Sequence, residues 1–341
     1  MAKHEIGVAP EEIVRHIALY TNSLKVYEGH YAQFWHLEPA HPIIYAGYLC
    51  PICLKNGFWL TSDGTLYSTQ VQFSLDHYPP DSVGGFENVV VCKTCNNYAG
   101  TKYEAALKKK LEDMSFNGGT PGASVPAKAE ISNVPGRYGS KITVRSDGIF
   151  DISFKPSHKS HTPHLDQWIN TSRNDPTWKA EVTIPLADET KVSKALLKAA
   201  YLYCFAAWGY EFAYSYTGTK IRRIICGNEQ YPLQNPSFWL GGATAPGTQL
   251  PVGVCYLYNN PELKCFMVNI PLIDLSTNYS NLSSILIPGP SHKDWDNLMR
   301  KGDTISDGKI ITISMAHVTE NLISIKMLTG YSKSWELLQS K

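Results

Sequence analysis

The pattern of apolar and polar positions predicts a chain that mixes helices with strands. Apolar residues recur at helical spacing over positions 13–18, directly after Pro10 and two glutamates, a typical first helical turn. Positions 58–60 and the alternating run 66–75 then predict two strands joined by a turn at 63–64. We expect this hairpin to present whatever follows position 75 at the end of a strand.

The segment that follows predicts a loop and then further helices. Two prolines at 79–80 cannot continue a strand ladder, and two glycines at 84–85 loosen the backbone, so a loop is expected there. A segment of three valines lies at 89–91 after this loop, and helix-compatible sequence follows Cys92, so the expected order is strand, strand, loop, helix. Another helix is expected over 101–114, with three lysines on a solvated face.

Composition divides the chain into three parts. Positions 116–140 are rich in glycine and proline and predict a linker between residues 1–115 and residues 141–341. In the last part, a helix is expected from a cap at Asp188 through Ala207. Strands are expected at 141–145, 149–154, 179–186, 221–226, 252–258, 264–273, 309–314 and 322–327. The predicted class is α+β.

Length and charge narrow the function classes only slightly. A chain of 341 residues with 43% hydrophobic and 18% charged residues is expected to be soluble and globular, with two domains or one unit with a long second part. Its formal net charge of +1 gives no global field of the kind that marks strong nucleic-acid binders. No segment has the length of a signal peptide or of a membrane span, so no membrane association is expected and the expected compartment is the cytoplasm.

Four of the eight cysteines predict a metal site. Cys50 and Cys53 form one C-x-x-C pair, and Cys92 and Cys95 form a second. Two such pairs can place four thiolates around one zinc ion, because each pair forms a small knuckle and a hairpin can bring the knuckles together. The alternative is four reduced, buried thiols without metal. The remaining cysteines are expected to fill the core.

At this point the residues resemble the HNH endonuclease family, whose ββα-metal motif holds a C-x-x-C pair, D-H-x-x-P, G-G, N and a second C-x-x-C pair followed by H or N. The matching residues appear here in the same order and span about residues 48–100. They are Cys50-Pro51-Ile52-Cys53, Asp76-His77-Tyr78-Pro79-Pro80, Gly84-Gly85, Asn88 and Cys92-Lys93-Thr94-Cys95-Asn96.

The resemblance implies an N-terminal ββα-metal module with structural zinc, followed by a larger α+β domain. It implies that His77 is the general base that activates water, and that Asp76 and Asn96 hold one divalent cation, Mg²⁺ or another, on the scissile phosphate. Asn88 would organise the loop that orients His77. The implied activity is phosphodiester hydrolysis, with DNA as the usual substrate of the family. A C-terminal domain that senses a signal licensing cleavage would suit a host-defence or mobile-element nuclease.

Two features depart from the family pattern. The last motif position is often histidine but is Asn96 here, and Asn97 could take its role if the helix were rotated. A basic residue often follows closely, whereas here the first is Lys102. Residues that bind substrate are therefore not identified.

Other interpretations stay open. One is a zinc-binding nucleic-acid or protein interaction module whose HNH-like site is inert. Another places an enzyme in residues 141–341, which show no P-loop, dinucleotide fingerprint or nucleophile motif. That part could instead recognise the target, mediate assembly, including a homo-oligomer, or sense a signal. The histidines at 158, 161 and 164 predict a solvated loop, and Arg222-Arg223 could meet a phosphate or an acidic neighbour.

Overall fold

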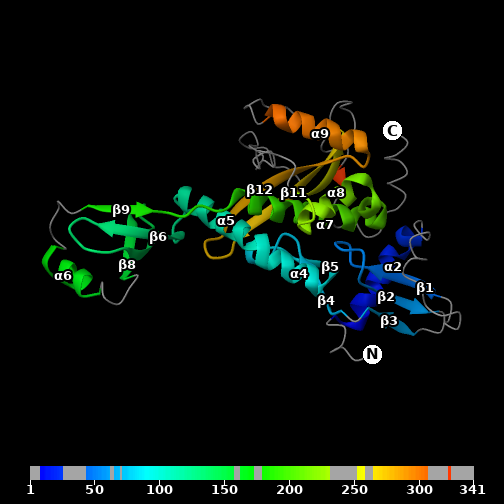
Figure 1. The fold of residues 1–341 in the computed structure, drawn as a ribbon, viewed down its shortest axis with the longest axis horizontal. Coiled ribbons are helices and arrows are strands. Elements are labelled where there is room, and N and C mark those ends of the chain that lie inside the picture. Colours follow the sequence, from blue (N-terminus) through cyan, green and yellow to red (C-terminus); the bar gives the residue numbers. More distant parts are fainter. Residues whose placement is uncertain are drawn as a thin grey trace. The chain divides into compact units, whose positions relative to one another are not determined.

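The fold is described from a computed structural model of the chain. It covers residues 8–25, 44–61, 65–69, 71–156, 162–172, 179–230, 252–257, 264–305 and 322–323. The chain forms two compact units (Figure 1). Unit 1 contains residues 1–105, 189–272 and 281–341, and unit 2 contains residues 106–188 and 273–280. Helices and strands both occur throughout, and this confirms the α+β class.

The core of unit 1 is built on helix α7 (Glu189–Tyr214), in which nearly every residue from Val192 onward is buried. Gly209, with φ 59° and ψ −138°, interrupts the helix, and α8 (Tyr216–Ile225) follows. Figure 1 shows both helices beside the sheet β12-β11-β10-β13, and Trp208 packs on Phe266 of that sheet with ring centroids 4.7 Å apart. Its strands are β10 (Gly253–Leu257), β11 (Cys265–Asp274), β12 (Tyr279–Pro288) and β13 (Leu322–Ile323), and α9 (His292–Ile305) follows β12.

The N-terminal part of unit 1 holds a three-stranded sheet and a separate ββα unit. The sheet β1-β2-β3 comprises Ile44–Leu49, Gly57–Thr61 and Leu66–Ser68 in antiparallel order. The predicted second strand ends early, and β4 (Phe73–His77) pairs instead with β5 (Glu87–Cys92). Helix α4 (Lys93–Ala99) follows β5 and continues through one π-helical turn, η2 (Gly100–Glu104). The order strand, loop, strand, helix therefore starts at Asp76-His77 and ends near Asn96.

Helix α2 (Pro10–Lys25), predicted from its first turn, completes the two-stranded β4–β5 sheet. The backbone N–H of Val90 donates to Nε2 of His16 (3.2 Å), and the carbonyl of Val90 accepts from the Tyr48 hydroxyl (2.7 Å). Nδ1 of His16 lies 2.8 Å from the carbonyl of Glu12, so the ring is neutral with its proton on Nδ1. The side chains of His16 and Tyr48 thus provide hydrogen-bond partners for the buried backbone N–H and carbonyl of Val90. Leaving these groups unpaired would reduce the stability of the fold.

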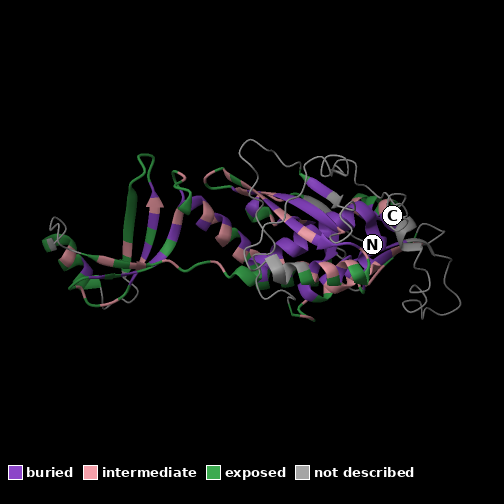
Figure 2. Ribbon diagram, turned by 90° about the horizontal axis from the view of Figure 1, so that it is seen from above, coloured by how far each residue is buried: buried purple, intermediate pink, exposed green. Residues whose placement is uncertain are grey.

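Unit 2 is a four-stranded antiparallel sheet with two helices. Strand order is β8-β7-β6-β9, and the alternating burial of β6 places Val125, Ala127, Ala129 and Ile131 on one face. Figure 2 shows this alternation in unit 2 and the denser burial of unit 1. The elements are α5 (Ala105–Asn117), β6 (Ser124–Ile131), β7 (Tyr138–Val144), β8 (Phe150–Pro156), α6 (Thr162–Ser172) and β9 (Ala180–Thr183).

The structure differs from the sequence expectations in three places. Residues 116–140, expected to be a linker, contain β6 and the start of β7. Unit 1 also includes α7, which lies more than 80 residues after its N-terminal segment 1–105 ends. The strand predicted at 221–226 is wrong, because this segment is the end of helix α8. Its buried residues Ile221, Ile224 and Ile225 follow helical spacing, which the β-branched composition concealed. The expected strand at 309–314 lies outside the described residues.

Helices in the described part of the chain were also compared with the requirements of a membrane span. None of them combines the length and apolar character needed to cross a bilayer.

Candidate functional site

The first cysteine pair lies in a tight turn directly after β1. The backbone N–H of Cys50 donates to the carbonyl of Asn56 (2.7 Å), and the N–H of Leu54 donates to the carbonyl of Cys50 (2.9 Å). Leu54 adopts the left-handed conformation, with φ 53°. These contacts close the turn so that the side chains of Cys50 and Cys53 face the same space.

The second pair is positioned by the start of a helix. Cys92 ends β5 and is the N-cap of α4, and Cys95 follows in the first turn of that helix. N-cap and N3 side chains lie on the same side of a helix start, so the two thiols converge. The sequence-predicted spacing thus becomes one strand end and one helical turn.

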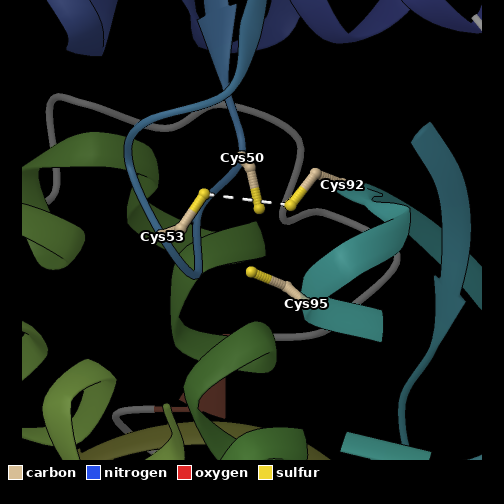
Figure 3. Close-up of side chains that lie close together, drawn as sticks. All are labelled: Cys50, Cys53, Cys92 and Cys95. Carbon is tan, nitrogen blue, oxygen red and sulfur yellow. Dashed lines mark hydrogen bonds between the residues drawn. The ribbon is translucent and has the colours of Figure 1, made fainter. Parts of the chain in front are cut away.

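The four sulfur atoms form a single cluster (Figure 3). All lie within 4.8 Å of one another, and Sγ of Cys53 is 3.9 Å from Sγ of Cys92. A tetrahedral zinc site with Zn–S bonds of about 2.3 Å has S–S separations of about 3.8 Å, whereas a disulfide has an S–S bond of about 2.05 Å. The thiols are free of disulfides. The predicted clustering is confirmed, and its geometry is compatible with zinc.

Electrostatics in the cluster favour thiolate formation at some positions. A hydrogen bond from Cys50 lowers the pKa of the Cys53 thiol to about 7, and the neighbouring thiols lower that of Cys92 further. Burial raises the pKa of Cys50 instead. A bound cation would favour the deprotonated form of all four ligands.

Two tyrosines of helix α7 form hydrogen bonds with the backbone at the first cysteine turn. The Tyr201 hydroxyl donates to the carbonyl of Pro51 (2.6 Å), and the Tyr210 hydroxyl accepts from the N–H of Leu49 (2.6 Å) while donating to its carbonyl. The cysteine cluster therefore brings the turn after β1 next to the start of α4, and hydrogen bonds from the two tyrosines attach that turn to α7.

Asp76 lies at the centre of a buried charge cluster. Its side chain, in a residue 2% exposed, contacts Nζ of Lys198 through Oδ1 (2.9 Å) and Oδ2 (2.6 Å). The same Nζ lies 2.6 Å from Oε1 of Glu104, at the end of η2. One ammonium group from α7 therefore bridges two carboxylates from different elements.

The protonation of this cluster follows from burial and attraction. Burial raises the pKa of both carboxyls, Asp76 and Glu104, while the Lys198 ammonium and, more weakly, His77 oppose the rise. Burial alone would lower the pKa of Lys198, but attraction to Asp76 and Glu104 outweighs it and the pKa is raised. Lys198 therefore stays charged, and the three formal charges sum to −1.

His77 lies at the last position of β4 and is partly accessible. The pairing of β4 with β5 matches Asp76 with Val89 and His77 with Glu87, so Asn88 is the extra residue of a β-bulge. The bulge breaks strict alternation, so adjacent side chains at 76 and 77 need not point to opposite faces. The His77 side chain is 30% exposed, and its Nε2 lies 4.0 Å from Oδ1 of Asp81.

The asparagines expected in the site differ in their contacts and exposure. Asn96 donates from its amide nitrogen to Oγ of Ser74 (3.0 Å), and Ser74 lies two residues before Asp76 on the same face of β4. Asn97 is exposed, so Asn96 is the residue that α4 presents to β4. The backbone of Asn88 forms the bulge, and its side chain lies outside the description.

The loop between His77 and β5 depends on its paired glycines. Gly84 has φ 81°, and Gly85 passes so close to the chain that an added Cβ would lie 1.5 Å from the carbonyl oxygen of Pro79. The loop returns from η1 (Asp81–Val83) to β5 through this contact. A side chain at Gly85 therefore requires the backbone beside His77 to shift.

We expect Gly85→Ala to lower the stability of unit 1 by about 2 kcal/mol or more, because the clash is with backbone. Thermal unfolding of the variant measures this loss. Gly139→Ala is the matched control, since its Cβ would meet Lys155 at an ordinary 3.6 Å, and it should change stability by less than about 1 kcal/mol. Equal unfolding temperatures for the two variants would contradict the assigned role of Gly85.

The site fits a divalent cation in its ligand chemistry. Mg²⁺ prefers oxygen ligands and is usually held by one or two carboxylates together with substrate phosphates. Asp76 supplies a carboxylate, and Asn96 can offer its side-chain carbonyl oxygen while its nitrogen remains on Ser74. The cation that contacts Asp76 here is the Lys198 ammonium.

Sequence reasoning missed the residues contributed by later parts of the chain. Lys198 lies within the helix expected from Asp188 through Ala207 and Glu104 within the helix expected over 101–114, but neither residue was singled out as part of a site. An unusually apolar stretch around Lys198, with Leu196, Leu197 and Ala199 to Phe205, was the available signal that this lysine is buried. Comparison with family models, with curated proteins and with solved structures found no match to this chain.

Proposed function

We propose that this protein is a metal-dependent endonuclease of the HNH type, with structural zinc at Cys50, Cys53, Cys92 and Cys95. One observation carries the proposal: the partly exposed His77 follows the buried Asp76 at the end of β4, in a ββα unit that contains two of the four clustered thiols. Asn96 of α4 faces the same strand. In this proposal the arrangement would bring a base and oxygen ligands together, as phosphodiester hydrolysis requires.

In the proposed reaction, His77 is the general base. Its neutral imidazole takes a proton from the attacking water, and the partial exposure of its side chain allows water and substrate to reach it. Asp76 and Asn96 would hold the catalytic cation, which would stabilise charge on the phosphate oxygens. Asn88 would organise the loop that orients the imidazole, and its backbone forms the bulge next to His77.

Zinc serves the proposed site through geometry and takes no part in the reaction. Cys92 and Cys95 fix the start of α4, and Asn96 is the next residue of that helix. Binding them to Cys50 and Cys53 would fix α4 relative to β1 and, through β5, relative to His77. A zinc-dependent scaffold of this kind keeps the base and the cation ligands within the tolerance that catalysis needs.

DNA is the proposed substrate, because DNA is the usual target of the family that residues 48–100 resemble. The net charge of +1 favours local contacts over a large basic surface. Unit 2, which contains its own sheet and core, is proposed to recognise the target or to regulate cleavage.

One observation favours a second function, a zinc-stabilised interaction module without catalysis. Both oxygens of Asp76 contact Lys198, and in an inert site this ion pair would be the permanent state. The module would bind nucleic acid or protein through the same ββα unit.

Cleavage of nucleic acid by the zinc-loaded chain separates the two functions. Supercoiled plasmid and single-stranded RNA are incubated with wild-type protein and Mg²⁺, Mn²⁺ or Ni²⁺, with chelator as control. The nuclease proposal expects nicked and linear plasmid only when the cation is present. Absence of any product with all three cations, while the folded protein still binds DNA, would establish the interaction module instead.

A further inference from the structure

The Asp76–Lys198–Glu104 cluster offers a cation position that the motif does not contain. Nζ of Lys198 lies within 2.9 Å of three carboxylate oxygens, two from β4 and one from η2. The shared ammonium group holds the two carboxylates in one cluster although like charges repel each other. The position is therefore lined with oxygen ligands and already occupied by a cation that the chain itself supplies.

Because the charge cluster is shielded from water, its carboxylates depend on a neighbouring cation for their stability. Lys198 is 1% exposed and Asp76 is 2% exposed, so water contributes little to the stability of either charge. The cluster carries a formal charge of −1 with Lys198, and without it the two carboxylates would carry −2, the charge that one divalent cation neutralises. Such a cation and the ammonium could not both occupy the position, because their repulsion is not screened there.

The π-helical turn explains how Glu104 reaches this position. Helix α4 begins at the second cysteine pair and carries Asn96, and η2 follows from Gly100 to Glu104. A π turn adds one residue to the helical repeat and changes which side chains face inward, and such turns are frequent at functional sites. Tyr103 is buried beside it, and Lys102 stays exposed.

We propose that Glu104 is a ligand of the divalent cation together with Asp76, and that Lys198 competes with the cation for both carboxylates. The inference rests on the proposed nuclease function for the use of the cation, but its binding chemistry stands on the cluster alone. Lys198 is then a positioning residue that sets cation affinity, and Glu104 completes a two-carboxylate site of the kind Mg²⁺ and Mn²⁺ take.

Binding of Mn²⁺ to zinc-loaded protein tests the proposal without reference to cleavage. Free Mn²⁺ is titrated by electron paramagnetic resonance against wild type, Lys198→Met and Lys109→Met. The last variant removes a lysine that pairs with Asp113 in unit 2. We expect Lys198→Met to bind Mn²⁺ at least about tenfold more tightly than wild type, because the competing charge is gone. The Lys109→Met control should bind as wild type does.

Two further variants identify the ligands. Adding Asp76→Asn or Glu104→Gln to Lys198→Met should each abolish the gain in affinity. Glu104→Gln alone keeps the Lys198–Asp76 pair, so it should fold, and we expect it to bind Mn²⁺ more weakly than wild type. Unchanged affinity in both Lys198→Met and Glu104→Gln would overturn the proposal.

Thermal unfolding covers the case in which Lys198→Met is poorly folded. The variant removes the ammonium group that the buried Asp76 and the partly buried Glu104 share, so its unfolding temperature should fall in buffer without divalent cations and recover with millimolar Mn²⁺. A variant that stays unfolded or equally unstable in Mn²⁺ would show that Lys198 is only a structural partner. Tight Mn²⁺ binding by Lys198→Met together with no cleavage by wild type would remove the nuclease proposal and leave the cation site. Cleavage by wild type together with unchanged Mn²⁺ affinity in Lys198→Met and Glu104→Gln would overturn the cation-site inference and leave the nuclease proposal in place.

Discussion

Replacing Cys92 by serine is expected to remove zinc from the chain and to unfold unit 1. Structural zinc sites of this kind contribute roughly 10–16 kcal/mol of apparent binding free energy, and a hydroxyl is a far weaker ligand than a thiolate. Cys92 also joins the end of β5 to the start of α4, so its loss releases the element that carries Asn96. Metal analysis should find about one zinc per wild-type chain and close to none in the variant.

Cys226→Ser is the matched control for this effect. Its thiol lies 4.0 Å from the carbonyl of Ile52, close to the first cysteine turn, yet it is not one of the four clustered ligands. This variant should keep its zinc and its unfolding temperature. Wild-type protein that is folded and contains no zinc would refute the metal assignment.

Replacing His77 by alanine is expected to reduce cleavage by roughly 10²–10⁴-fold, the usual contribution of a positioned general base. The His77 side chain is 30% exposed and ends a strand, so its removal should leave zinc content and unfolding temperature unchanged. Single-turnover cleavage of plasmid at saturating cation measures the effect.

The control for His77 is a histidine on the same unit with no proposed role. His292→Ala removes an exposed ring of α9 that pairs with Asp296, and it should cleave at the wild-type rate. A similar loss of cleavage activity in His77→Ala and His292→Ala would show that the loss is not specific to position 77. It would contradict the assignment of His77 as the general base.

Local sequence signals predicted the cysteine cluster because its geometry is local. A C-x-x-C pair closes within one turn or at one helix start, so spacing alone brings each pair of thiols together. The positions of Asp76 and His77 at a strand end followed in the same way from the prolines and glycines after them. The zinc and the catalytic cation themselves stay predictions.

Contacts between distant segments could not be predicted from these signals. Lys198 reaches Asp76 across 122 positions, and Tyr210 reaches Leu49 across 161. No periodicity within α7 says which strand it will cover. The same limit explains the domain boundary, because glycine and proline at 116–140 indicate turns, and turns occur within a sheet as readily as between domains.

His16 illustrates the limit for a single residue. A histidine in an amphipathic N-terminal helix gives no sign that it will accept a hydrogen bond from Val90, 74 positions away. That role depends on β5 pairing with β4 alone among the described strands, which is a property of the sheet and not of either sequence. Fold class and cysteine cluster were thus accessible from the sequence. The pairing of β4 with β5 across the loop and the electrostatic environment of Asp76 were not.

The most direct test of the nuclease account is rescue of His77→Ala cleavage by free imidazole. Removing the side chain of a partly exposed histidine leaves room for imidazole to act as the base. We predict that wild-type protein nicks plasmid in the presence of a divalent cation, that His77→Ala does not, and that added imidazole restores part of the rate. Nicking by His77→Ala at the wild-type rate without imidazole would contradict the account.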